Sequence, residues 1–309
     1  MREITAAQIA DAVCTLTIQA NRILPDDIKA ALEAGLRQET ADLAAAALSM
    51  GAMESPAAMP GGSKTAGKPM QEALPPLLAD IRRNWQAAEE TGLPVCQDTG
   101  MSVVFAEVGQ EVHITGGLLM DAVNAGVARA TNEGYLRASV VDSPLSRRNT
   151  GDNTPAVLHT VLMAGDSIKL TVAPKGFGSE NMSRIYMLTP AAGKQDIIDC
   201  VVDAARRAGG CPCPPMVLGV GLGGDFELCA LLAKKALCRG LTPHPQTEYA
   251  ALERDALAAV NELRIGVQGF GAGPTALFVA VETYPTHIAG LPVAVNVGCH
   301  VNRHAETVI

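Results

Sequence analysis

The sequence predicts an α/β fold, with α+β as the alternative, in which an N-terminal helical region precedes mixed β-sheet layers flanked by helices. Three observations predict it. Of the 309 residues, 48% are hydrophobic and 18% charged, which is enough apolar surface for a large packed core. Helix-like stretches occupy residues 5–50 and about 71–91. Beyond that point strand-like and helix-like runs are mixed, as is typical of layered folds.

The first helices are expected over residues 5–50. The stretch "AAQIADAVCTLTIQANRIL" has helical spacing, and "PDDIKAALEAGL" opens with Pro25 and two acids, which favours a helix start. A further helix, at about 71–91, contains Trp85, the only tryptophan. Between these helices, residues 52–69 are rich in small residues, Pro and Gly. They predict a surface loop or flexible insertion within a helical subregion of about 1–92.

The region of about 93–309 is expected to hold the sheets. The segments "MSVVFAEVG" (101–109) and "EVHITGG" (111–117) predict a pair of strands, and residues 118–136 predict a helix. Further strands are expected at 156–165, 167–175, 215–224, 275–285 and 291–299, and further helices at 195–208, 225–237 and 246–263. We see no fixed-period repeat and treat residues 1–309 as one domain.

Composition argues against two classes of partner. No apolar run reaches the roughly 20 residues needed to span a bilayer, and the N-terminus "MREITAAQIADAV" lacks the apolar stretch of a signal peptide. The formal net charge is −8, no basic cluster stands out, and aromatic residues make up 3%, which disfavours a nucleic-acid surface. The sequence therefore predicts a cytoplasmic protein that binds neither nucleic acid nor membrane.

The chain has eight cysteines, which are too widely spread for a small disulfide framework. Four lie in helix-like apolar stretches, where a small buried side chain is the simplest interpretation: Cys14, Cys200, Cys229 and Cys238. The other four lie in segments bounded by glycine or proline, where function concentrates: Cys96, Cys211, Cys213 and Cys299.

Two interpretations of the loop cysteines stay open on spacing alone. A structural zinc site usually shows two close cysteine pairs, whereas this chain has one such pair, Cys211 and Cys213. Three dispersed thiolates suit an iron–sulfur cluster that leaves one iron open as a Lewis acid. Without further signals, unrelated buried thiols are favoured over such a cluster.

Three polar or glycine-rich segments are candidate ligand loops. "TGDNTP" (150–155) is a polar turn, and "KGFGSEN" (175–181) can present backbone N–H groups to an anion, although each alone is typical of a loop without a ligand. "GVGLGG" (219–224) has the spacing G-x-G-x-G-G. It differs from the dinucleotide fingerprint G-x-G-x-x-G and lacks an acid at the required distance, so we reject nucleotide binding there.

Five segments, in order along nearly the whole chain, carry a resemblance. They are "PVCQDTG", "YLRASVVDSPLSRRNTGDNTPAV", "APKGFGSENMS", "CPPMVLGVGLGG" and "ETYPTHIAGLPVAVNVGCHVNRH". Together they resemble the α-subunit of class I, iron–sulfur-dependent fumarate hydratases, whose superfamily also holds the α-subunit of L(+)-tartrate dehydratase. The third and last segments are more similar to the fumarase form than to the tartrate form.

The resemblance implies a 4Fe–4S cluster held by three cysteines. Matched motif by motif, these are Cys96, Cys213 and Cys299. The family usually has a single cysteine before "PP", whereas here Cys211 precedes Cys213 by two residues. Cys213 keeps the position next to Pro214, and Cys211 is assigned as a spare thiol.

The resemblance also implies a hydro-lyase of the tricarboxylic acid cycle, which reversibly hydrates fumarate to (S)-malate with the open iron as Lewis acid. Arg137 matches a substrate-binding arginine, whose fork suits a carboxylate. Gln97 and Asp98 are expected to contact substrate, and Asp98 also to orient or activate the proton-transfer group. His287 matches an active-site histidine that would hydrogen-bond substrate or assist the hydroxyl proton.

An anion site is implied for the segment 176–181. The residues expected to line it are Gly176, Gly178, Ser179 and Asn181. Phe177 stands where the family commonly has a third glycine, so the shape of this loop departs from the pattern. His300 and His304 follow the last cluster cysteine and are weaker candidates, as supports of the ligands.

Single-chain family members continue into a second domain that carries a proposed base and further substrate-binding residues. This sequence ends at Ile309, just after the last motif, so the resemblance implies a β-subunit partner in an α2β2 assembly. Two alternatives stay open. One is a subunit of a dehydratase for L(+)-tartrate or a related hydroxy-diacid. The other is a non-catalytic iron–sulfur sensor or scaffold, which would not need the substrate-facing residues.

Overall fold

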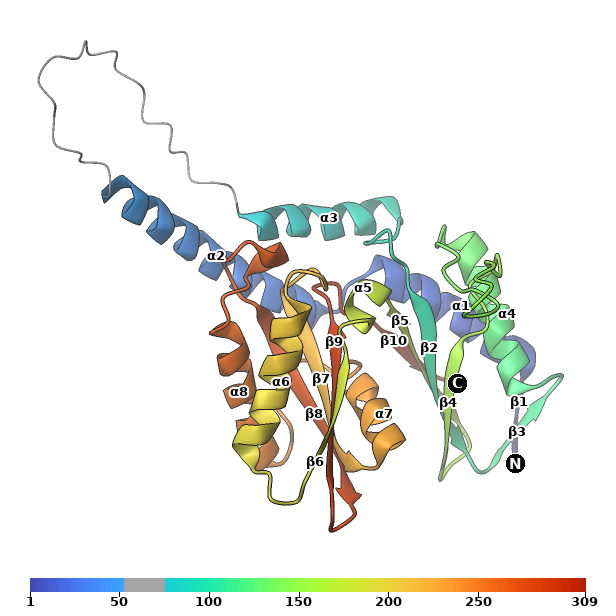
Figure 1. Ribbon diagram of the computed structural model, residues 1–309. Helices are drawn as coiled ribbons and strands as arrows, with labels where there is room; N and C mark the ends of the chain where they lie inside the picture. The colour runs from blue at the N-terminus through green and yellow to red at the C-terminus, as the bar shows by residue number, and fades with distance from the viewer. Residues whose placement is uncertain (53–75) are drawn as a thin grey trace, which may run out of the picture.

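The computed structural model describes residues 1–52 and 76–309. Helices and mixed sheets form its layers (Figure 1), which confirms the predicted α/β class. The helices are α1 (Ala6–Arg22), α2 (Asp26–Ala52), α3 (Leu77–Thr91), α4 (Leu119–Glu133), α5 (Phe177–Glu180), α6 (Lys194–Ala208), α7 (Phe226–Ala236) and α8 (Thr247–Asn261). The strands are β1 (Arg2–Thr5), β2 (Met101–Gly109), β3 (Val112–Thr115), β4 (Val157–Met163), β5 (Ile168–Lys175), β6 (Arg184–Leu188), β7 (Met216–Gly224), β8 (Ala276–Thr286), β9 (Leu291–Gly298) and β10 (Ala305–Val308).

Two four-stranded sheets carry the fold, and a small two-stranded sheet joins β1 to β3. The first has the order β10-β5-β2-β4, with β2 parallel to β4 and antiparallel to β5. The second has the order β6-β9-β7-β8, with β7 parallel to β8 and antiparallel to β9. Each central strand is therefore flanked on both edges, as its nearly continuous apolar sequence requires.

One predicted pairing is wrong. The segments 101–109 and 111–117 form strands, but β2 and β3 do not pair with each other, because β3 pairs with β1 in parallel. The burial of the two strands explains the difference. Seven of the nine residues of β2 are buried, so it takes a central place between β4 and β5. No residue of β3 is buried, and it stays at the periphery.

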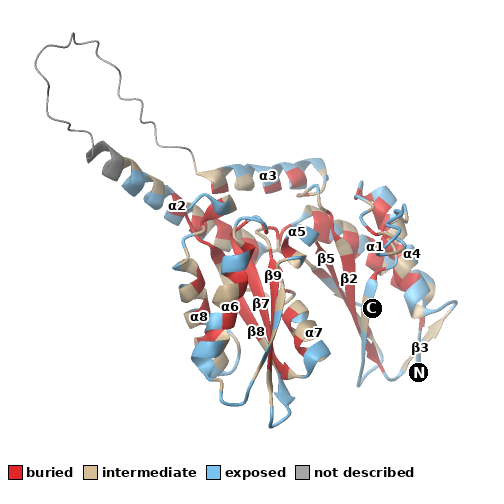
Figure 2. Ribbon diagram, in the orientation of Figure 1, coloured by how far each residue is buried: buried red, intermediate tan, exposed pale blue. Residues whose placement is uncertain are grey.

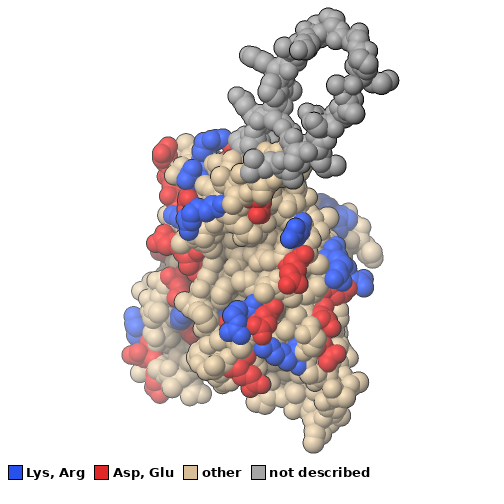
Figure 3. Space-filling view, turned by 90° about the vertical axis from the view of Figure 1, so that its left-hand side faces the viewer, with Lys and Arg blue, Asp and Glu red and all other residues tan. Residues whose placement is uncertain are grey.

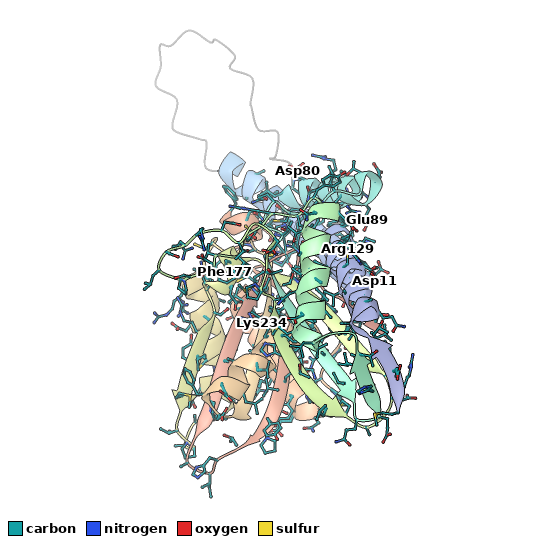
Figure 4. All side chains as sticks on the ribbon, turned by 90° about the vertical axis from the view of Figure 1, so that its right-hand side faces the viewer. Asp11, Asp80, Glu89, Arg129, Phe177 and Lys234 are labelled. Carbon is teal, nitrogen blue, oxygen red and sulfur yellow. The ribbon has the colours of Figure 1, made fainter. Side chains whose placement is uncertain are left out.

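Helices cover the outer faces of both sheets, and α7 lies between them. One core joins α1 and α4 to β2 and β5, and another joins α6 and α8 to β7, β8 and β9. Residues of α7 pack on the other face of the second sheet, while Lys235 reaches Glu107 of β2 (Nζ–Oε1 3.2 Å). Figure 2 shows the buried strands enclosed by half-buried helices. Between α1 and α4, Asp11 pairs with Arg129 (2.8 Å; Figure 4).

The glycines of "GVGLGG" let α7 approach β7 closely. A Cβ atom on Gly219 would lie closer than 3.0 Å to the carbonyl oxygen of Ala233, and one on Gly221 equally close to that of Cys229. Real Cβ atoms do not come so close, so these positions need glycine for packing. The segment is thus a buried strand, as the sequence predicts.

We expect Gly221→Ala to destabilise the protein. The added methyl group would force α7 away from β7, and overpacking of this kind costs about 1–3 kcal/mol. Thermal or urea unfolding followed by circular dichroism measures the change. Gly290→Ala is the control, because a Cβ atom there meets nothing within 4 Å and should change stability by less than about 0.5 kcal/mol. Equal stability of the two variants would contradict the packing argument.

The helices α2 and α3 cross one end of both sheets (Figure 1). A separate core beneath them includes Ile28, Leu32, Trp85 and Val217, and Cys96 is half-buried against it. Because Val217 belongs to β7 and Cys96 follows α3, this core ties the second sheet to the first cysteine loop. The loop is therefore held at the end of the sheets that the two helices cover.

The expected helix at 71–91 is described from Leu77 as α3. Its start is fixed by the buried carboxylate of Glu39 on α2, which accepts the N–H groups of Leu77 (2.8 Å) and Leu78 (2.9 Å). A carboxylate at this end of a helix satisfies free N–H groups and complements the helix dipole. Ala52 is the last residue of α2, and the rest of the expected insertion at 52–69 lies outside the described residues.

Three short strands were not predicted: β1, β6 and β10. Each lies at the edge of a sheet and has four or five residues. Among the cysteines expected in helices, Cys14, Cys200 and Cys229 are buried, and Cys238, just beyond α7, is half-buried. Acidic and basic side chains are interspersed on the face shown in Figure 3. In the described ranges, no helix is both long and apolar enough to cross a bilayer.

Candidate active site

A cavity of about 150 Å³ lies where β5 and β9 end, beside the loops that follow α3 and α6. It is lined by many of the residues expected from the sequence: Cys96, Gln97, Asp98, Gly176, Gly178, Ser179, Cys213, Cys299 and His300. Cys211 lines it too, together with two basic residues that were not predicted, Lys175 and Arg303. Segments far apart in the sequence thus meet in one hollow.

The loop that carries Cys96 is held by its own carboxylate. Asp98 accepts the N–H of Gly100 at Oδ1 (3.0 Å) and the N–H of Phe177 at Oδ2 (3.1 Å). Gly100 has a φ of +75°, and a Cβ atom there would lie 2.7 Å from the backbone of Lys175. The glycine that ends "PVCQDTG" is therefore required by the turn and by the close approach of β5.

The motif "TGDNTP" braces this loop from behind. Asn153 is buried, donates to the carbonyl of Gly100 (3.0 Å) and accepts the N–H of Ser139 (2.9 Å). The N–H of Arg137 donates to the hydroxyl of Thr99 (2.9 Å). The backbone of Arg137 is thus fixed next to the Cys96 loop, while its side chain is exposed and does not line the cavity.

The expected anion loop contains the short helix α5. Gly176 lies against Asp98, because a Cβ atom at Gly176 would meet Oδ2 of that carboxylate at 2.9 Å. Ser179 is buried and its hydroxyl donates to the carbonyl of Gly176 (3.2 Å). Asn181 ends α5 and is exposed outside the cavity. The departure at Phe177 is accommodated, since its side chain is 47% exposed.

A buried ion network lies under this loop. Lys175 is 8% exposed, donates to Ser179 Oγ (2.7 Å) and pairs with Glu180 (3.2 Å). Glu180 also pairs with Lys234 of α7 and accepts from Asn296 of β9 (2.9 Å). Burial lowers the pKa of Lys175, although Glu180 opposes that shift. Burial raises the pKa of Glu180, but the two lysines outweigh it and the pKa is lowered overall.

The other two cysteine loops are tied together by His300. The ring Nδ1 of His300 lies 2.9 Å from the carbonyl oxygen of Cys213. The backbone N–H of His300 donates to the same oxygen (3.4 Å). Burial lowers the pKa of His300, which favours the neutral ring. Burial also raises the pKa of the Cys213 thiol, and the nearby sulfurs of Cys299, Cys96 and Cys211 raise it further.

The donor set is one that a metal–sulfur cluster could use. All eight cysteines are free, and Cys96, Cys213 and Cys299 line one cavity on separate loops. Within the described part of the chain, no three His, Cys, Asp or Glu side chains converge tightly enough to hold one metal ion. A cluster that takes one thiolate on each of several irons can be held by cysteines from separate loops. The raised pKa values of the Cys213 and Cys299 thiols mean that loading would release protons.

Two histidines expected from the sequence lie outside the cavity. His287 is exposed in the turn between β8 and β9, and its ring accepts the N–H of Ala289 (3.1 Å). The strand β9 separates His287 from Cys299, so within one chain the two lie at opposite ends of that strand (Figure 1). His304 is half-buried and does not line the cavity.

Lys175 and Arg303 were missed, although both lie inside quoted motifs. The signal that could have found them is position, because Lys175 ends a buried strand and Arg303 follows the last loop cysteine by four residues. A charged side chain in a sequence is usually interpreted as exposed. Only the assembled loops show that Lys175 is 8% and Arg303 5% exposed.

Comparisons with known proteins identify the family of the chain. The family model of fumarate hydratase (fumerase) matches residues 67–308. A putative L(+)-tartrate dehydratase subunit alpha of Methanocaldococcus jannaschii is 35% identical over 305 residues, which is 96% of each chain. An L(+)-tartrate dehydratase subunit alpha of Escherichia coli O157:H7 is 30% identical over 230 residues, covering 73% of this chain and 76% of that protein.

The match places the chain among the hydro-lyases, the enzymes that add water to a carbon–carbon double bond or remove it to form one. More narrowly, the chain belongs to the fumarate hydratase (fumerase) family, whose model covers residues 67–308.

Proposed function

We propose that this chain is the α-subunit of a fumarate hydratase, which reversibly converts fumarate to (S)-malate. The observation that carries the proposal is the meeting of Cys96, Cys213 and Cys299 with Asp98 in one cavity. Thiols alone would suit a sensor or scaffold. A sensor or scaffold has no evident use for the fixed Asp98 carboxylate and the adjacent exposed Gln97. A substrate of a hydro-lyase, in contrast, needs polar partners.

A 4Fe–4S cluster held by these three cysteines would supply a Lewis acid for the substrate hydroxyl and carboxylate. The chain itself orients the reactants. Asp98 is held by two backbone N–H groups, which keeps its carboxylate fixed and able to accept a hydrogen bond or a proton. Gln97 offers an amide at the cavity edge, and Lys175 adds positive charge beneath the anion loop.

Dehydration of L(+)-tartrate is the second candidate, because relatives with substantial identity carry that name. The segments "APKGFGSENMS" and "THIAGLPVAVNVGCHVNRH" support fumarate instead, by their resemblance to the fumarase form. Both reactions would use the same thiols and carboxylate, so the choice depends on how the cavity receives a second hydroxyl group.

A substrate panel tests the proposal. The chain, loaded with iron and sulfide under anaerobic conditions and combined with its β-subunit, should hydrate fumarate with a higher kcat/KM than it shows for dehydration of L(+)-tartrate. The loss of fumarate absorption at its ultraviolet band and a coupled assay for oxaloacetate follow the two reactions. A preference for tartrate would select the second candidate, and turnover of neither diacid would favour a sensor or scaffold.

We further infer an α2β2 assembly in the cytoplasm. The relatives from both organisms are named alpha subunits, which supports a β-type partner. The exposed His287 lies away from the cavity of its own chain. If His287 takes part in the reaction, it therefore acts in the cavity of another copy of this chain in the assembly. Light scattering of the purified complex measures the stoichiometry.

We expect Arg137→Met to lower kcat/KM by roughly 10- to 100-fold, because a charge-assisted carboxylate contact contributes on the order of 1.5–3 kcal/mol. The backbone of Arg137 is anchored beside the Cys96 loop, which supports a role for its side chain near a substrate bound there. Steady-state kinetics on the loaded complex provide the measurement. The control is Arg206→Met on the exposed face of α6. If Arg137→Met left kcat/KM unchanged, Arg137 would be only a surface residue.

A further inference from the structure

The guanidinium of Arg303 is a buried cation at the wall of the cavity. The residue is 5% exposed, and it lines the same hollow as the three thiols. Its Nη2 donates to the backbone carbonyl of Asp98 (2.6 Å). Its Nε is buried and has no hydrogen-bond partner in the described part of the chain.

This charge differs from that of the other buried basic side chain of the cavity. Lys175 pairs with Glu180, but among the described residues no carboxylate forms a salt bridge with Arg303. A buried charge without a partner and an unsatisfied buried donor are both costly. The structure therefore calls for an anion beside Arg303 that the described acidic side chains do not supply.

The anions that we infer for this position are the cavity cysteines, which would become thiolates when a metal is bound. Arg303 follows Cys299 by four residues, and both residues line the same cavity as Cys96 and Cys213. Its hydrogen bond to Asp98 ties this segment to the loop of Cys96. The Nη2 of Arg303 already donates to a carbonyl, and the side chain is almost fully buried. Arg303 is therefore poorly placed to bind a substrate carboxylate in a bidentate manner.

We propose that Arg303 is a positioning residue that counterbalances the negative charge of the metal–thiolate centre and braces the loops of Cys96 and Cys299. This inference rests on the proposed thiol site and adds to it a residue with a defined electrostatic role. Lysine would preserve the charge and lose the fork, whereas methionine would remove both.

The test uses the full chain reconstituted anaerobically with Fe²⁺ and sulfide. In Arg303→Met the midpoint potential of the cluster should fall, because the lost positive charge no longer favours the reduced, more negative state. EDTA should bleach the cluster roughly 10- to 100-fold faster, as expected for the loss of one charge-assisted hydrogen bond. Arg303→Lys should keep a potential near that of the unchanged chain and bleach at an intermediate rate.

Arg239→Met is the matched control. Arg239 also has a buried Nε without a partner in the described ranges, but it pairs with Glu253 and Glu282 away from the cavity. This variant should lose thermal stability and keep the potential. If Arg303→Met does not fold, Arg303→Gln removes the charge while keeping a donor, and its potential should still fall.

The outcomes separate the two proposals. A loaded cluster whose potential and bleaching rate are the same with Met, Gln or Arg at position 303 would overturn the role of Arg303 and leave the thiol site intact. An unchanged chain that takes up no cluster would overturn the thiol site and this inference with it.

Discussion

The substitutions Cys96→Ser, Cys213→Ser and Cys299→Ser should each abolish the broad visible absorption of the anaerobically reconstituted chain. The three cysteines lie on separate loops that meet at one cavity, so each would supply one corner of the cluster. A serine hydroxyl is a far poorer ligand for iron than a thiolate. Absorption spectra, with iron and sulfide analysis, provide the measurement.

Cys211→Ser is the control for this series. Cys211 is exposed and lines the same cavity, so it matches the other three in chemistry and location. We expect it to leave the absorption in place, because the resemblance to fumarate hydratases implies that the ligand is Cys213, the cysteine next to Pro214. Loss of the cluster with Cys211→Ser and its retention with Cys213→Ser would exchange the two assignments.

The helices were predicted closely where both periodicity and a start signal were present. The helix expected at 225–237 is α7, whose first turn is capped by the Asp225 carboxylate accepting the N–H of Leu228 (2.9 Å). The edge strands were missed because four or five residues carry too little pattern, and their partners define them. The pairing of β2 was wrong for a related reason, since adjacency in sequence does not specify which strands meet.

The candidate site, like the fold, could be predicted from the sequence only in part. Motifs identified the loops that meet at the cavity, because Gly100 and Gly176 are required by close approaches that leave a mark in the sequence. Burial of charge leaves no such mark, so Lys175 and Arg303 emerged only from the assembled structure. His287 shows the converse, since a motif match twelve residues before Cys299 gave no indication that β9 separates the two.

The cavity offers too few free basic groups for a diacid substrate, which points to a contribution from a partner subunit. A diacid substrate has two carboxylates, and the described basic groups at the cavity are mostly committed: Lys175 pairs with Glu180, and Arg303 donates to the carbonyl of Asp98. In the proposed function Arg137, whose side chain is exposed outside the cavity, would serve one carboxylate. A cationic partner for the other, and a proton-transfer group, would then come from a second chain across an interface of more than about 2,000 Å², the usual size for obligate complexes.

We therefore expect the loaded chain alone to hydrate fumarate negligibly, and addition of the β-subunit to raise the rate by at least about 10³-fold. A positioned acid or base contributes roughly 10²–10⁴-fold, and a charge-assisted carboxylate contact adds on the order of 1.5–3 kcal/mol. Fumarate hydration at increasing β-subunit concentration is the measurement. Cys213→Ser serves as the control, since it should bind the β-subunit in sedimentation experiments without gaining activity. If the isolated chain turned over as fast as the complex, the base would lie within these 309 residues, and Asp98 would be the group to test first.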